Sequence, residues 1–298
     1  MTRSIPIKYQ SKKKMYEFVV FLCLIGFVIF GIYKNGFAYL SMQKITLEEA
    51  LKTLVFPVFS VITSLIIHSL KEKKLTFSLE GINEGLLCGL MIPTRFPIIP
   101  FLLISIIFHV ANQFLKEKIS TLSFLAVYKV SIILVGLLMN IGLENLVEMN
   151  TAYSYGSLDA LFGKSIGAFG TTNIFLIILI FFFLATNFYY KKELPIYAII
   201  SYSLCFLGGL ILNNSYPVST FLNSSFFFAI VFLLPESKTS PALKKEQFIY
   251  GVSMGIISYL FIFIFNMLEG AYIALLIVNI IWLVYYLNRQ KKLKKALG

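Results

Sequence analysis

Ten runs of apolar residues, separated by short polar segments, make up most of the chain. Most of the runs are long enough to cross a bilayer as a helix, which takes about 20 apolar residues. The third run is the shortest and carries Glu80, Asn83 and Glu84. The pattern predicts an all-α integral membrane protein of about ten transmembrane helices. The runs cover residues 16–33, 52–70, 79–92, 97–115, 122–140, 172–190, 194–212, 218–234, 247–267 and 270–287.

The composition agrees with this pattern. Apolar residues form 58% of the 298 residues and charged residues 13%, and the mean hydropathy is +0.83. Ordinary soluble domains have about 45–50% apolar and about 25% charged residues. Ten spans leave no room for a sizeable soluble catalytic domain, and the sequence has no Walker loop or Ser/His/Asp arrangement. Hydrolase and nucleotidase functions are therefore excluded.

The formal net charge of +12 follows from the predicted topology. Most of the 26 basic residues fall in every second polar segment, as expected when those segments face the cytoplasm. Their scatter in short clusters is not typical of a nucleic-acid partner. The pattern predicts a multi-pass protein of the cytoplasmic membrane with both termini inside.

The longest polar segment divides the chain into two halves of five predicted helices. The third run of each half ends at a proline, followed by a polar link and another proline, at 93–100 and at 235–241. An odd number of spans per half makes the second half enter from the opposite face, which is an inverted repeat. We therefore divide the chain into a basic N-terminus (1–15), a first repeat (16–140), an extracytoplasmic loop (141–171), a second repeat (172–288) and a basic tail (289–298).

Glycines recur at helical spacing on two of the predicted helices. Gly81, Gly85 and Gly89 share one face of the third helix, and Gly251 and Gly255 share one face of the ninth. Such faces favour close packing of helices. The alternative is that the thin glycine-lined helix leaves room for a planar ligand or a pore.

A few charged residues lie where lipid or buried protein is expected, and such charges are costly unless they serve a function or are paired. Lys129 lies inside the fifth run, either buried and paired or extended to the headgroups. Glu84, with Glu80 one turn away, is a candidate counter-charge for such a cation or a proton relay. Arg95 is either interfacial or placed to neutralise a phosphate or a semiquinone anion.

The cysteines and histidines give no sign of a metal site or a disulfide. Cys23, Cys88 and Cys205 lie inside apolar runs without metal-ligand spacing, and His68 and His109 are far apart in the sequence. We expect all five to be structural.

Three segments of the second half together resemble one family. Residues 236–241 read ESKTSP, residues 247–255 read QFIYGVSMG and residues 269–279 read EGAYIALLIVN. They are similar to the TDxxTSP link, the glycine-containing helix start and the EGxxxAxLLxN helix of the NqrB/RnfD family. That family comprises membrane subunits of sodium-pumping NADH:quinone oxidoreductases and of Rnf complexes. The resemblance covers about residues 80–288.

The chain also departs from the family pattern. Residues 85–97 and 158–171 resemble family segments, but residues 116–126 read KEKISTLSFLA where the family has GGxGxNxFNPA. Lys129 stands where the family has an arginine. The outer loop lacks the S/D-G-x-T motif that carries esterified FMN in many members, so covalent flavin is not expected, with Thr151 as the only fallback.

The resemblance implies a non-autonomous subunit of an oxidoreductase that carries electrons across the membrane, with or without coupled ion movement. Flavin (non-covalent FMN or riboflavin) and quinone are the implied redox groups. Implied partners are other membrane subunits and, as in reduced relatives from flavin-based extracellular electron transfer, an extracytoplasmic flavoprotein and an NADH dehydrogenase or the quinone pool. The alternatives are a small-solute or vitamin transporter with inverted repeats and a scaffold subunit. Under the electron-transfer hypothesis the cofactor-binding residues are Lys129, Arg95, Glu84, Thr94, Thr239, Ser240, Gly251 and Asn279.

Overall fold

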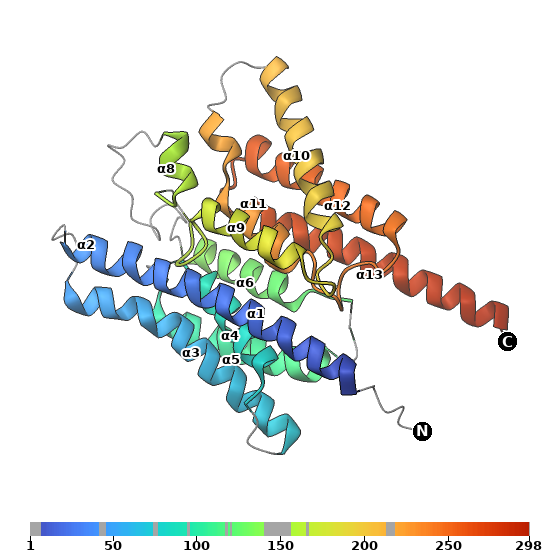
Figure 1. Cartoon of the computed structure of the whole chain (residues 1–298), viewed down its shortest axis with the longest axis horizontal. Coiled ribbons are helices and arrows are strands. Elements are labelled where there is room, and N and C mark those ends of the chain that lie inside the picture. Colours follow the sequence, from blue (N-terminus) through green and yellow to red (C-terminus); the bar gives the residue numbers. More distant parts are fainter. Residues whose placement is uncertain are drawn as a thin grey trace.

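Every regular element in the computed structural model is helical, within the residues that the structure describes: 7–41, 46–73, 77–93, 96–116, 119, 121–139, 156–164, 167–212 and 218–297. The α-helices and the short η segments are arranged as one bundle (Figure 1). In chain order they are α1 (Ile7–Ile32), η1 (Tyr33–Phe37), α2 (Ala38–Ser41), α3 (Leu47–Glu72), α4 (Leu79–Leu90), α5 (Ile98–Leu115), α6 (Phe124–Leu138), α8 (Ser157–Leu161), α9 (Ile174–Ala185), α10 (Glu193–Leu212), η2 (Val218–Phe221), α11 (Ser224–Phe228), η3 (Ala229–Leu233), α12 (Lys244–Tyr259), η4 (Leu260–Ile264) and α13 (Gly270–Leu297).

Each of the ten predicted runs coincides at least in part with one or more of these helices. Within the described residues, six helices are long and apolar enough to cross a membrane. The chain is therefore a multi-pass membrane protein. Ten crossings and cytoplasmic termini stay predictions, because the remaining helices are shorter than a full span. The six are Lys12–Phe37, Thr53–Glu72, Ile98–Leu115, Glu193–Leu212, Lys244–Ile264 and Gly270–Lys291, and the shorter apolar ones are Phe124–Leu138, Ile174–Ala185 and Ser224–Leu233.

Polar side chains fix where three of the short helices begin. The oxygens of Ser78, Asn173 and Asn223 accept hydrogen bonds from the first-turn amides of α4, α9 and α11. Such N-caps satisfy amides that have no partner within the helix. The short helices thus have defined ends inside the bundle.

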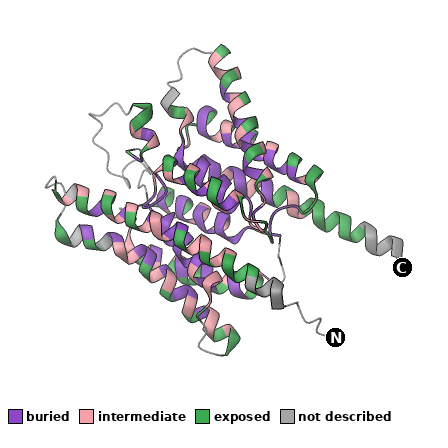
Figure 2. Ribbon diagram, in the orientation of Figure 1, coloured by how far each residue is buried: buried purple, intermediate pink, exposed green. Residues whose placement is uncertain are grey.

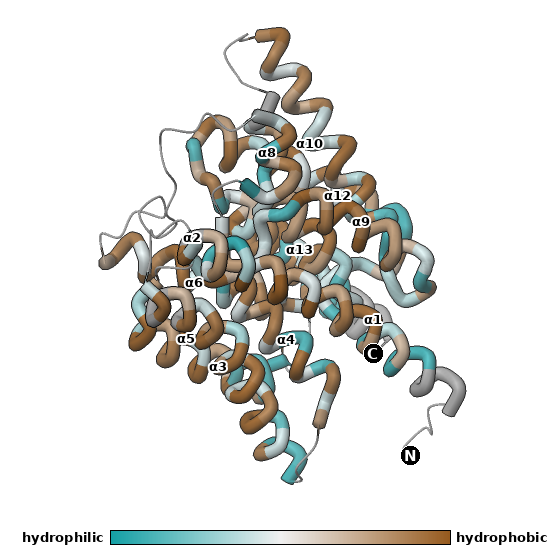
Figure 3. The backbone as a smooth tube through the Cα atoms, turned by 60° about the vertical axis from the view of Figure 1, so that its left-hand side comes forward, coloured by the Kyte–Doolittle hydropathy of each residue, from teal (hydrophilic) through white to brown (hydrophobic). Residues whose placement is uncertain are grey.

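The outer surface is apolar and the interior holds many polar side chains. Leu138, Ile211 and Leu212 are each more than 80% exposed, whereas Lys129, Asn279 and Ser60 have no exposed surface. Buried residues gather where the halves meet (Figure 2), and apolar residues colour most of the tube away from the helix ends (Figure 3). An exposed apolar surface of this extent is typical of contact with lipid or with other membrane proteins.

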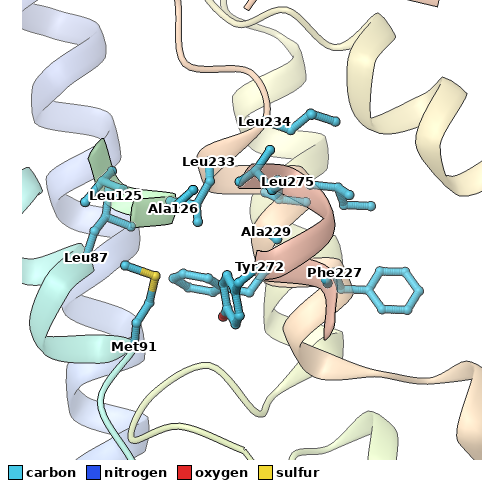
Figure 4. Packing of buried hydrophobic residues seen from close by; sticks show 14 of the residues in the cluster. Leu87, Met91, Leu125, Ala126, Phe227, Ala229, Leu233, Leu234, Tyr272 and Leu275 are labelled. Carbon is cyan, nitrogen blue, oxygen red and sulfur yellow. The ribbon is translucent and has the colours of Figure 1, made fainter. Parts of the chain in front are cut away.

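The helices of the two halves pack in equivalent pairs. In the first half, α1 packs on α4, α3 on α4 and α5, and both α4 and α5 on α6. In the second half, α9 packs on α11, α10 on η3 and α12, and both α11 and α12 on α13. The halves meet through α6 and α13 and through α1 and α9. Figure 4 shows Leu87, Met91 and Leu125 of the first half facing Leu233 and Tyr272 of the second.

The glycine faces serve helix packing. A Cβ atom on Gly85 would lie 2.6 Å from the Cα of Val61, and one on Gly89 would overlap the backbone of Pro57, both on α3. Gly255 on α12 meets the backbone of α10 in the same way. Because α3 fills the glycine face of α4, that face lines no pore or planar-ligand site.

Candidate functional site

A fully buried ion pair lies where the two halves meet. Lys129 on α6 has no exposed surface, and its Nζ donates to Glu269 Oε1 at 2.5 Å and to the carbonyl oxygen of Met91 at 2.6 Å. The ring of Tyr272 lies with its centroid 5.3 Å from the same nitrogen. Lys129 is therefore buried and paired, and the alternative in which it extends to the headgroups is wrong. We call Lys129 and Glu269 the central ion pair.

The short helix α4 provides one side of this site. The last carbonyls of a helix have no partner within it, and here they are bonded from outside. Lys129 donates to Met91, while the amide of Phe169 donates to Ile92 at 2.8 Å and that of Gly170 to Leu90 at 3.3 Å. The C-terminal end of α4 is thus held by hydrogen bonds from α6 and from the segment that precedes α9.

Asn279 makes a second connection between α6 and α13, and here the side chain belongs to α13 and its partners precede α6. Its Oδ1 accepts from the amide of Ser123 at 2.7 Å, and its Nδ2 donates to the carbonyl of Thr121 at 3.0 Å. The side chain of α13 thus bonds the residues that precede α6, just as Lys129 of α6 bonds the residue that precedes α13. Both predicted residues hold the two halves together.

Glu84 lies in a separate cluster, which corrects its expected pairing with Lys129. Asn112 Nδ2 donates to Glu84 Oε2 at 2.6 Å, and Lys116 forms a short ion pair with Glu84 Oε1. The Lys116 Nζ also lies 3.7 Å from Glu80 and 3.9 Å from Glu236 of the second half. We call these four charged residues, Glu80, Glu84, Lys116 and Glu236, the end cluster.

Burial and charge oppose each other in the end cluster. Burial acts to lower the pKa of Lys116, but the carboxylates of Glu84 and Glu236 outweigh it and hold that pKa above its ordinary value. Burial raises the pKa of Glu236, although Lys116 partly offsets it. The cluster therefore keeps Lys116 charged, while Glu80 is also paired with Lys238 at 2.9 Å and with Lys13 at 3.2 Å.

Thr239 and Ser240 stabilise the link between η3 and α12. The Ser240 hydroxyl donates to the Glu236 carbonyl at 2.6 Å and accepts from Lys191 Nζ at 2.7 Å, and Thr239 Oγ1 lies 3.4 Å from the Glu236 carbonyl oxygen. Burial lowers the pKa of Lys191 to about 8, against the opposing effect of Glu236. Both predicted side chains are occupied within the link.

Other predicted residues fall outside a shared site. Thr94, Arg95 and Thr151 lie outside the residues that the structure describes. Gly251 faces α10, where a Cβ atom would lie 2.8 Å from Tyr197 Cβ. His68 Nδ1 is 3.2 Å from Gln113 Nε2. The cysteines Cys23 and Cys88 are buried, and Cys205 is partly buried.

The structure adds an apolar groove that the sequence did not reveal. It lies between α12 and α13, has a volume of about 260 Å³, and opens on the exposed side of both helices, where Ile249 and Ile281 are more than half exposed. Trp282, the single tryptophan of the chain, lines it beside Tyr250 and Tyr285. The remaining lining residues are Glu246, Ser253, Ile257 and Val278.

Besides the Ser253 hydroxyl, two of the groove's polar groups have partners. Glu246 forms a 2.6 Å ion pair with Arg289 at one end, and the Tyr250 hydroxyl accepts from Asn279 Nδ2 at 3.2 Å. Asn279 thus joins the groove to the contact between α6 and α13.

The two implied redox groups fit these places differently. The central ion pair does not fit flavin, because Lys129 has no exposed surface and already neutralises a protein carboxylate. The groove has an apolar lining with aromatic rings along its wall and Glu246 at its end, a lining typical of sites for apolar ligands.

Glu269 and Trp282 are the residues whose roles the sequence did not predict. Glu269 stood at the head of a motif, but nothing marked it as the partner of a lysine 140 residues away. Its Oε2 is buried and has no hydrogen-bond partner among the described residues. The sequence feature that could have drawn attention to Trp282 is that it is the only tryptophan of the chain and lies inside an apolar run.

The sequence model of the NQR2, RnfD, RnfE family matches residues 99–294, which is more than half of the chain. The match takes in Lys129, Glu269, Asn279 and the whole groove, and begins after Glu84 and Arg95. No curated protein matches the chain. The chain belongs to the NQR2, RnfD, RnfE family.

Proposed function

We propose that the chain is the membrane subunit of an electron-transport system in which quinone binds the groove between α12 and α13. The observation that carries this proposal is the family match, which covers every residue of the groove and of the central ion pair. Protein side chains supply no redox centre here, so the electrons must belong to a bound cofactor or substrate. The subunit is non-autonomous and works with other membrane subunits.

The groove suits a quinone in shape and chemistry. Its opening on the lipid side allows an isoprenoid chain to enter from the bilayer, and Trp282 and Tyr285, with ring centroids 5.1 Å apart, offer aromatic faces to the quinone ring. We propose that the polar groups of the lining residues Glu246, Tyr250 and Ser253 meet the quinone oxygens.

The central ion pair holds one wall of the groove in place. Glu269 directly precedes α13, and α13 carries Trp282 and Tyr285. By bonding Glu269, Lys129 ties α13 to α6 and to the end of α4. An ionisable pair inside a membrane protein is by default a functional feature, and here its role is to position α13.

We also propose the finer topology: ten crossings of the cytoplasmic membrane, built as two inverted repeats with both termini inside. The equivalent helix pairs of the two halves and the reciprocal bonds of Lys129 and Asn279 support the repeat. In this arrangement the electrons leave to an extracytoplasmic flavoprotein, and they are supplied by an NADH dehydrogenase through the quinone pool.

The test is electron flow from a quinol to an external acceptor in membrane vesicles that contain the chain with its partners. Ser253→Phe fills the groove, and we expect it to slow the flow at least tenfold. Ile256→Phe is the matched control, because Ile256 lies on α12, is 40% exposed and does not line the groove. Equal rates in the two variants would overturn the quinone site.

The absorption spectrum of the purified chain, before and after quinol is added, separates the redox function from its rival. A flavin band that quinol bleaches supports electron transfer and shows that this chain binds FMN or riboflavin itself. A colourless protein that neither binds quinone nor supports electron flow, and that moves a solute into liposomes, establishes the transporter instead.

A further inference from the structure

Asn279 is a fully buried side chain whose orientation is fixed by backbone groups. Its Oδ1 accepts from the amide of Ser123 at 2.7 Å, and its Nδ2 donates to the carbonyl oxygen of Thr121 at 3.0 Å. Turning the amide over would place oxygen against the carbonyl and nitrogen against the N–H group, and neither contact can form a hydrogen bond. The Nδ2 atom therefore faces the Tyr250 hydroxyl, which lies 3.2 Å away.

The bond from Asn279 decides the role of the Tyr250 hydroxyl. A phenolic hydroxyl accepts through its lone pairs and donates its single proton. The Asn279 Nδ2 group occupies a lone pair, so the proton remains free to donate, and no residue in the described part of the chain accepts it. Because a buried donor without an acceptor is costly, we expect the acceptor to come from outside the chain.

The groove between α12 and α13 is the space in which such an acceptor can lie. Tyr250 lines it from α12, one turn after Glu246, and its ring centroid is 6.1 Å from that of Trp282 on α13. Tyr250 is only 3% exposed, so lipid beyond the groove has little access to it. A molecule bound in the groove is thus the ligand that can supply the acceptor.

We propose that Tyr250 donates its hydroxyl proton in a hydrogen bond to a carbonyl oxygen of the ligand in the groove. Asn279 is then a positioning residue, because its Nδ2 keeps the hydroxyl from donating into the protein and leaves it to donate to the ligand. The inference rests on the proposed function, since the carbonyl is that of a quinone. A quinone carbonyl only accepts hydrogen bonds, so this donor favours a quinone over a hydrocarbon of the same shape.

The hydrogen bond is tested by two ligands that share a carbon skeleton and differ in their oxygens. They are the quinone menadione and its oxygen-free counterpart methylnaphthalene, each titrated calorimetrically into the purified full chain. We expect Tyr250→Phe to weaken menadione binding about three- to tenfold, the usual range for one uncharged hydrogen bond, and to leave methylnaphthalene binding unchanged. Tyr286→Phe is the matched control, because Tyr286 lies on α13, is 37% exposed and does not line the groove. Equal menadione affinity in the two variants would overturn the assignment.

The positioning role of Asn279 has its own test. In Asn279→Asp, a carboxylate oxygen that only accepts replaces Nδ2, so the Tyr250 proton turns toward it and away from the groove. We expect menadione to bind this variant as weakly as Tyr250→Phe, with no further loss when both substitutions are combined, and methylnaphthalene to bind as it does to the wild type. An equal loss of both ligands would show that Asn279 acts only through packing and would contradict the positioning role.

Ser253→Phe separates this inference from the proposed function, because it fills the groove and should abolish binding of both ligands. If Ser253→Phe loses menadione while Tyr250→Phe binds it as tightly as the wild type, the groove stands and the hydrogen bond is refuted. Menadione binding that neither substitution changes would refute the groove itself.

Discussion

At the scale of single residues, the most informative feature is a charge with no access to water. Lys129 has one charged partner, Glu269, and one carbonyl partner, Met91. Removing one member of a buried pair leaves the other charge uncompensated, which costs far more than the pair itself contributes. The pair is thus best tested by removing each member alone and both together.

Lys129→Met should lower the free energy of unfolding by about 3–5 kcal/mol, because it strands the Glu269 carboxylate in the core. Adding Glu269→Met should recover most of that loss. Chemical unfolding of the wild type, both single variants and the double variant in one detergent gives the coupling energy. Losses that simply add in the double variant would mean that the two residues do not interact.

The lowered pKa of Lys191 predicts how the stability of the chain depends on pH. Its folded-state pKa of about 8 lies below the ordinary value of 10.5. Between these values the unfolded chain binds more protons than the folded chain, so the free energy of unfolding should rise with pH across this window. Lys191→Met should remove that part of the slope, measured as thermal midpoints from pH 7.5 to 10.5. Lys192→Met, an exposed neighbour, should leave it unchanged, and an equal slope in both variants would count against the assignment.

At the scale of helices, the hydrophobic pattern predicted which segments are helical but not how they end. The sixth run was expected to extend to residue 190, yet α9 ends at Ala185, followed by a turn. The eighth run is divided between η2 and α11 because Asn223 caps a new helix within it, and α11 continues directly into η3. The π-helical segments η1, η3 and η4 were not predicted; η3 and η4 consist of apolar residues alone and leave no period to follow.

The glycine faces give a prediction at this scale. Gly89→Ala should cost about 1–3 kcal/mol of folding free energy, because its methyl group would overlap the backbone of Pro57. Gly26→Ala is the matched control in α1, since no atom lies within 4 Å of the place its methyl group would take, and it should be neutral or stabilise by up to about 1 kcal/mol. Unfolding of the two variants in the same detergent measures both. Equal effects would show that α4 does not approach α3 as closely as described.

At the scale of the whole molecule, local patterns predicted where helical segments lie but could not predict which distant residues meet. The partner of Lys129 is 140 positions away in the other half, and the obvious nearer candidate, Glu84, belongs to the end cluster. The groove was invisible for the same reason, because its walls are the exposed sides of two helices that each resemble ordinary lipid-facing surface. The resemblance in sequence identified the family, whose model covers the second half of the chain, but it gave only motifs and did not predict which residues contact one another.

The proposed topology is testable by labelling. Ten crossings place Ser157 on α8 outside and Ser237 in the link between η3 and α12 inside, and both are exposed. In intact cells, a membrane-impermeant maleimide should label Ser157→Cys and spare Ser237→Cys, which should react only after permeabilisation. Labelling of both positions in intact cells would rule out this orientation.

The most direct test of the proposed function uses the fluorescence of Trp282, the chain's single tryptophan, which lines the groove. Quinones quench a nearby tryptophan, so titrating the purified chain with a short-chain quinone reports binding at that place. We predict saturable quenching in the wild type and in Ile256→Phe, and its loss in Ser253→Phe. Quenching that rises without saturation and equally in all three proteins would contradict a quinone site between α12 and α13.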